Sequence, residues 1–107
     1  MIEAENGLIG CILCDNECIE NVSKKLKPEM FADEIAADCY REMLDLYDRQ
    51  GVIDIVPLSQ ALESAKYDSG TVMEYLKTCV NSNVTSVLAQ GYADSIEKEW
   101  KSRTVKQ

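Results

Sequence analysis

Histidine is missing from the 107 residues of this chain. Because imidazole is the side chain that titrates near neutral pH, its absence excludes histidine general acid–base catalysis, Ser-His and Cys-His nucleophile pairs, and histidine metal ligands. No apolar run approaches the roughly 18 residues of a transmembrane helix. Positive charge is also scarce, with 11 Lys and Arg against 19 Asp and Glu and a net charge of −8. Nucleic acids and anionic membranes attract clustered positive charge, so we expect neither as a direct partner.

Proline and glycine, which interrupt regular structure, occur only two and five times. Strict apolar–polar alternation, the pattern of a half-buried strand, is hard to find, whereas apolar residues often recur every three or four positions. A chain of this length is typically one domain, since about 100–150 residues is the commonest domain size. The sequence therefore predicts an all-α fold, a compact orthogonal bundle of about six short helices, in a single globular domain over residues 1–107.

The clearest helix is predicted over residues 35–50. Its apolar stripe consists of Ala36, Cys39, Tyr40, Met43, Leu44 and Tyr47. Gly51 follows where a left-handed residue ends a helix at little cost. Residues 3–14 form a second clear pattern, apolar over so wide an arc that this helix must be central in the core or covered by a partner.

A shorter helix is predicted between Asp15, as its N-cap, and Pro28, which stops it. Its apolar stripe is Ile19, Val22 and Leu26. Three lysines are expected in its last turn, where positive charge suits the helix dipole: Lys24, Lys25 and Lys27. Met30 and Phe31 are then expected to fill the core from a short turn.

Three helices are predicted in the second half of the chain. Residues 53–57 are expected to form an extended connector, with Pro57 at the first helical position. The turn Asp68-Ser69-Gly70 is expected to precede a helix from Thr71 onward. A last helix, capped by Thr85 or Ser86, would place Leu88, Tyr92, Ile96 and Trp100 on one stripe. It has no stop signal before Gln107, so we expect the chain to be a fragment of a longer protein.

The five cysteines are an odd number, and residues 1–5 do not resemble a signal peptide. We therefore expect reduced thiols and a cytoplasmic protein. Cys11, Cys14 and Cys18 would share a helix face, and with Cys39 or Cys79 they could complete a four-thiolate zinc site. The alternative is core packing, which is favoured because Cys11, Cys39 and Cys79 fall on apolar stripes. We expect no metal.

Paired carboxylates and closely spaced glycines could also indicate chemistry. Carboxylates pair at Glu3 with Glu5, Asp45 with Asp48, and Glu97 with Glu99, but we interpret all of them as solvated groups on polar faces. No glycine-rich phosphate loop is present, and Gly7 and Gly10 are interpreted as points of close helix packing. Most aromatic residues fall on apolar stripes. Trp100, near the end of the chain, is a candidate anchor for a protein interface.

Several segments, in order along the chain, resemble the N-terminal domain of DnaB-type replicative helicases. They are Glu3-Ala4-Glu5 with residues 8–13, residues 26–31 (Leu-Lys-Pro-Glu-Met-Phe), residues 46–51 with 53–58, Gly70 with Tyr75-Leu76, and Tyr92-Ala93 with Ile96-Glu97. The second segment departs from the family's Leu-Lys-Pro-Glu-Asp-Phe at Met30. The resemblance covers nearly the whole chain.

The resemblance implies a non-catalytic protein-interaction domain without a cofactor of its own. In this family the domain contributes to the hexameric ring and to contacts with primase and with the helicase loader. ATP and Mg²⁺ would belong to a separate C-terminal ATPase domain, which this chain lacks together with the family's helical hairpin. By position, Glu3 and Tyr75 match surfaces associated with interdomain and primase contacts, and Tyr75 could equally pack in the core.

Two other functions remain open from the sequence. One is the helicase-binding C-terminal domain of a primase, which has a similar fold. The other is a stand-alone helical protein that binds a metal ion through cysteine thiolates. The Glu-Ala-Glu and Lys-Pro-Glu segments favour the helicase domain.

Overall fold

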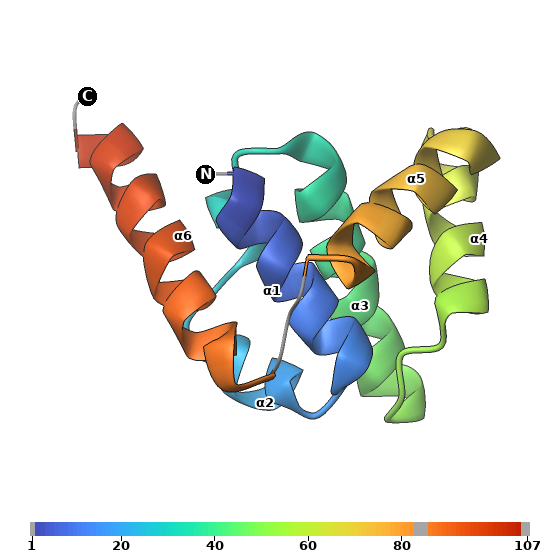
Figure 1. Ribbon diagram of the computed structural model, residues 1–107, viewed down its shortest axis with the longest axis horizontal. Coiled ribbons are helices and arrows are strands. Elements are labelled where there is room, and N and C mark those ends of the chain that lie inside the picture. Colours follow the sequence, from blue (N-terminus) through green and yellow to red (C-terminus); the bar gives the residue numbers. More distant parts are fainter. Residues whose placement is uncertain (1, 83–85, 106–107) are drawn as a thin grey trace.

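The first helix, α1 (Ile2–Cys14), is the central element of the molecule. The computed structural model describes residues 2–82 and 86–105. Leu8, Ile9 and Ile12 of α1 are fully buried. Helices α3, α5 and α6 all contact α1, and Figure 1 shows it running between α6 on one side and α3 and α5 on the other. The wide apolar arc of this helix is thus explained by neighbours from within the chain.

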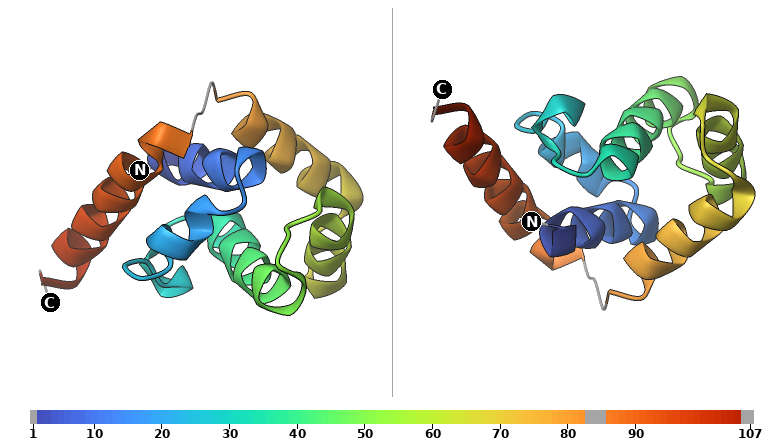
Figure 2. Two further views of the ribbon diagram at one scale, coloured as in Figure 1. Left: turned by 90° about the horizontal axis from the view of Figure 1, so that it is seen from below. Right: turned by 90° about the horizontal axis from the view of Figure 1, so that it is seen from above.

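The remaining elements surround α1 in chain order. Their bounds are α2 (Cys18–Val22), the 3₁₀ helix η1 (Pro28–Met30), α3 (Glu34–Gln50), α4 (Ile55–Ala65), α5 (Ser69–Val80), the 3₁₀ helix η2 (Ser86–Leu88) and α6 (Ala89–Val105). Residues 2–82 and 86–105 contain six α-helices and no strand, which confirms the predicted all-α fold. Figure 2 shows α6 far from the α4–α5 pair, with α1 between them.

The long helix α3 agrees with its predicted pattern. Ala36, Cys39, Tyr40 and Met43 are buried, while Leu44 and Tyr47 pack at the edge of the core. Gly51 adopts a φ of 74° and its amide donates to the Tyr47 carbonyl, so the helix ends in the left-handed residue that the sequence indicated. Met30 and Phe31 are buried beside η1, as expected.

The predicted second helix is wrong in extent. α2 ends at Val22, so Lys24, Lys25 and Lys27 follow the helix and do not lie in its last turn. The residue at its N-cap is Glu17 rather than Asp15, and Glu17 provides no side-chain cap. Residues 23–25 continue as turns, in which the Lys25 and Leu26 amides both donate to the Val22 carbonyl. These turns still deliver Leu26 to the core, because its side chain is 1% exposed.

Two other boundaries differ from the prediction because polar side chains cap helices earlier than expected. Asp54 accepts from the Val56 amide and starts α4 at Ile55, so Pro57 is the third residue of the helix rather than the first. Asp68 accepts from the Thr71 amide, so Ser69 and Gly70 are helical rather than part of a turn. Of the two predicted caps of the last helix, Thr85 lies outside the described residues. Ser86 is the first residue of η2 and not the cap of α6, which begins at Ala89.

Candidate functional site

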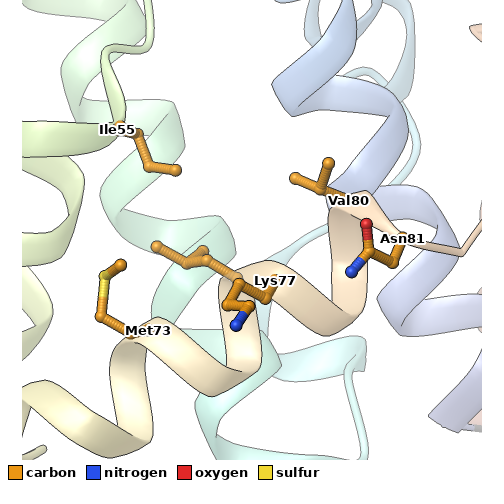
Figure 3. Close-up of a pocket in the computed structure, with 6 residues that line it drawn as sticks. Ile55, Met73, Lys77, Val80 and Asn81 are labelled. Carbon is orange, nitrogen blue, oxygen red and sulfur yellow. The ribbon is translucent and has the colours of Figure 1, made fainter.

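An apolar hollow lies on the surface between α5 and the start of α4, on the far side of the molecule from α6. Its volume is about 310 Å³, and its lining residues are Ile55, Met73, Leu76, Lys77, Val80 and Asn81 (Figure 3). The lining is dominated by aliphatic and thioether side chains. Such a concave apolar surface with few polar groups is the usual form of a binding site.

The hollow exists because α5 is apolar on two adjacent faces. One face, formed by Val72, Tyr75, Leu76 and Cys79, is buried against the core. The neighbouring face carries Met73 and Val80, which remain 52% and 43% exposed. A helix of a globular protein normally presents polar residues outward, so a second apolar face on α5 is a surface without a described partner.

The start of α4 forms the opposite wall. The Asp54 cap fixes the first turn of α4, and Ile55 in that turn is 44% exposed beside the hollow. Val52 and Val56, near Ile55 in the chain, are also about half exposed, at 49% and 57%. Three apolar residues at and just before the start of α4 are therefore exposed to solvent.

Two polar side chains border this apolar surface. Lys77 lies between Met73 and Val80 along α5, and Asn81 is the C-cap residue of the helix. Neither side chain forms a hydrogen bond or ion pair with any residue that the structure describes. The hollow thus offers one ammonium and one amide to a ligand. Its lining residues carry no hydroxyl, thiol or carboxylate.

The three interface residues predicted from the sequence do not come together. Glu3 is exposed near the start of α1. Tyr75 is buried on the inner face of α5, with 9% exposure, and Trp100 is partly buried on α6, where it packs against the core. Figures 1 and 2 place α5 and α6 on opposite sides of α1, so Tyr75 and Trp100 belong to different faces of the molecule. Their roles in an interface stay predictions.

Tyr75 has an unusual polar environment. Its hydroxyl oxygen is buried and has no hydrogen-bond partner among the described residues. Burial raises the pKa of this hydroxyl, and the nearby thiols of Cys79 and Cys39 raise it further. Tyr75 therefore remains a neutral phenol at physiological pH, packed as an apolar residue beneath the exposed face of α5.

The cysteines follow the core-packing interpretation at three positions. Cys11, Cys39 and Cys79 are fully buried, Cys18 is partly buried and Cys14 is exposed. Burial raises the pKa of the Cys79 thiol to about 11 and that of Cys18 to about 12. Within the described part of the chain, no three His, Cys, Asp or Glu residues are grouped so that they could hold a metal ion.

The interpretation of the carboxylate pairs as solvated is wrong for Glu5. Its side chain is 2% exposed and accepts hydrogen bonds from two backbone amides just before α3, Ala32 N at 2.7 Å and Asp33 N at 3.0 Å. Glu5 therefore serves as a cap for α3 supplied by α1. The sequence does contain a signal for this burial. Glu5 lies three or four positions from apolar residues of α1, within an arc of the helix that is otherwise apolar.

The sequence interpretation also missed the hollow. Helical periodicity places five apolar residues on one face of α5, but the last of them, Val80, lies at the edge of that face and is exposed: Val72, Tyr75, Leu76, Cys79 and Val80. Met73, which precedes Val80 by two turns, is exposed beside it on the helix. The width of the apolar arc of α5 indicates such an exposed face, because Met73 and Val80 widen the arc beyond what one packing neighbour covers.

Comparison with known families gives one match. The family model described as "DnaB-like helicase N terminal domain" matches residues 1–98 of the 107-residue chain. No curated protein matches the chain significantly. None of the helices in the described residues is long and apolar enough to cross a membrane.

Proposed function

The chain belongs to the family of DnaB-like helicase N-terminal domains, and from this we propose that it is a docking domain of a replicative DNA helicase. The domain has no catalytic role in the helicase. Its finer function would be to bind other polypeptides: neighbouring subunits in the hexameric ring, the primase, and the helicase loader. The parent protein would be an ATP-dependent DNA helicase, with ATP and Mg²⁺ bound by a separate motor domain and none by this one.

The observation that carries this proposal is the family match over residues 1–98. Two physical properties support it. The exposed apolar surface around Ile55, Met73 and Val80 is typical of a protein-binding site. The net charge of −8 disfavours direct binding to nucleic acid, so the domain would not compete with a motor domain for DNA.

The test is binding of the purified, reduced chain to proteins encoded in the same genome. Isothermal titration would measure its affinity for the C-terminal domain of the primase, for the loader and for the full helicase. We expect binding to the primase domain or the loader. Binding to the helicase alone would favour the alternative in which the chain is the helicase-binding domain of a primase. Binding to none of these proteins would contradict the proposal.

Direct nucleic-acid binding is a separate expectation. A fluorescently labelled single-stranded oligonucleotide should show no change in anisotropy with the chain at physiological salt, because the protein carries a net charge of −8 and is repelled by the phosphate backbone. Micromolar binding would show that the role of the domain includes contact with DNA.

A further inference from the structure

Along the border between the buried and the exposed faces of α5 runs a stripe of residues whose spacing matches the contact surface of a helix. Met73, Leu76, Lys77 and Val80 lie three and four positions apart, so they share one side of the helix. The eight residues from Met73 to Val80 span about 10 Å of helix axis, or two turns. Ile55 of α4 lies across from this stripe, as Figure 3 shows, and gives the hollow its second wall.

The shape and composition of this hollow favour a helix as its occupant. A groove between two helices, walled by aliphatic side chains, accepts a third helix that inserts residues at i, i+3 or i+4, and i+7. Met73 is half exposed at one end of the stripe, and methionine side chains adapt readily to the shape of an inserted partner. With a volume of about 310 Å³, the hollow can receive apolar side chains from such a helix.

Lys77 determines the charge that a partner helix must carry beside its apolar residues. Of the described residues, it is the one charged group that lines the hollow, and it forms no ion pair with any of them. A partner that covered the hollow with apolar residues alone would desolvate this ammonium without compensation. An acidic residue on the partner helix would instead pair with it at the edge of the apolar contact.

A second copy of the chain is a poor occupant. In a symmetric pairing of two α5 stripes, Lys77 would lie close to the two-fold axis because it is near the middle of the stretch from Met73 to Val80. The two ammonium groups would then repel each other. Among the side chains that the structure describes, the exposed large apolar ones outside the hollow are those of Val52, Val56, Val87 and Leu88, which form no helical stripe that could enter the groove of another copy.

We propose that the hollow between α4 and α5, formed by Ile55, Met73, Leu76 and Val80 with Lys77 at its edge, docks an amphipathic helix of another protein that carries apolar residues at helical spacing and a carboxylate facing Lys77. This inference rests on the proposed docking function and names the surface and the partner chemistry through which it acts.

The test selects ligands without assuming a partner. A displayed library of helical peptides would be selected on the native chain and counter-selected on the double variant Met73→Ser/Val80→Ser. Both residues are about half exposed, so the variant should keep its circular dichroism and its urea midpoint. We expect enriched peptides that need the native hollow, with apolar residues at i, i+3 or i+4, and i+7 and an Asp or Glu beside them.

A charge reversal keeps the proposal falsifiable if the double variant does not fold. Lys77→Glu should weaken the selected peptides at least fivefold, and exchanging the peptide's acidic residue for Lys should restore binding. The matched charge control is Lys98→Glu, at an exposed position of α6 across the molecule. The matched apolar control is Val87→Ser.

The proposal is overturned if no enriched peptide depends on the hollow, if the dependent peptides carry basic rather than acidic residues, or if light scattering shows that α5 pairs two copies of the chain. These results are independent of the binding to primase and loader. A failure of the proposed docking function and a failure of this surface can therefore be told apart.

Discussion

Glu5 connects two segments of the chain from inside the molecule. Its carboxylate lies on the central helix α1 and receives the amides of Ala32 and Asp33, the two residues that lead into α3. Asp33 itself is the N-cap residue of α3 but provides no side-chain cap. Glu5 thus satisfies donors that the start of a helix leaves unpaired, and it does so from a distant part of the sequence.

Replacing Glu5 should therefore cost stability. Glu5→Gln leaves one oxygen acceptor and turns an amide group toward a backbone N–H, so one buried donor loses its partner. We expect the free energy of unfolding, measured with urea, to fall by about 1–3 kcal/mol. Glu3→Gln, an exposed change two residues away, should stay within about 0.5 kcal/mol of the native chain. Equal effects of the two substitutions would contradict the capping role.

The thiols differ in exposure, and this gives a second prediction at the scale of the residue. Cys14 is exposed, whereas burial raises the pKa of the partly buried Cys18 thiol to about 12. Because the thiolate is the reactive form, an aromatic disulfide reagent should label one thiol of the native chain rapidly at about pH 8. Cys14→Ser should remove this fast phase, and the other thiols should react after unfolding in urea. A fast phase that survives the substitution would show that another cysteine is open to solvent.

At the scale of the helix, a glycine of α1 lies directly against a side chain of α6. A Cβ atom on Gly7 would lie 2.6 Å from Cζ of the Tyr92 ring on α6. That separation is shorter than any ordinary van der Waals contact, so Gly7 permits the ring to pack on the backbone of α1. The interpretation of Gly7 as a point of close packing is confirmed.

Two glycine substitutions test this contact against helix propensity. Gly7→Ala should lower the free energy of unfolding by about 1–3 kcal/mol, because the Tyr92 ring and α6 must shift. Gly91→Ala on α6 meets open space and should raise it by about 0.5–1 kcal/mol through helix propensity alone. Thermal or urea unfolding measures both. A gain in stability at Gly7 would show that Tyr92 moves aside at little cost.

Segments between helices are held by single side chains from the helices around them. Asn16, just after α1, accepts from the Ile53 amide at 2.9 Å and so fixes the segment that leads into α4. The buried Tyr40 hydroxyl of α3 donates to the Leu26 carbonyl at 3.1 Å. On α6, Arg103 donates to the Met30 carbonyl at 3.0 Å. These bonds satisfy backbone groups that no helix pairs, which is why irregular segments can lie against the core.

At the scale of the whole molecule, buried thiols and phenols make stability depend on alkaline pH. Burial raises the pKa of Cys79 to about 11 and of Cys18 to about 12, and it also raises the pKa of the Tyr40 and Tyr75 hydroxyls. The ordinary values are 9.0 for a thiol and 10.0 for a phenol. Above these values the unfolded chain has lost protons that the folded chain retains.

The contribution of these buried thiols and phenols to the free energy of unfolding should therefore be constant below about pH 9. It should fall as the pH rises further, because the unfolded state then binds fewer protons than the folded state. The measurement is the urea midpoint in the presence of reductant at about pH 7 and about pH 10, with a lower midpoint expected at the higher pH. An unchanged or higher midpoint would mean that the folded protein does not raise the pKa of these groups.

The sequence by itself determined the helical architecture and the buried face of the long helix α3. These features are periodic, so the residues that specify them lie within one or two turns of each other. Gly51 is equally local, because a left-handed residue after an apolar stripe ends a helix in almost any context. The family was also accessible from the order of short segments along the chain.

Only the tertiary structure decided which apolar and acidic groups are covered. Glu5 is buried because two amides from residues 32 and 33 meet it, and nothing near Glu5 in the sequence specifies them. Met73 and Val80 are exposed because the α4–α5 pair leaves the outer face of α5 open, whereas periodicity alone places Val80 with the core. Local pattern identifies which residues can be buried, but burial itself depends on neighbours that are distant in the chain.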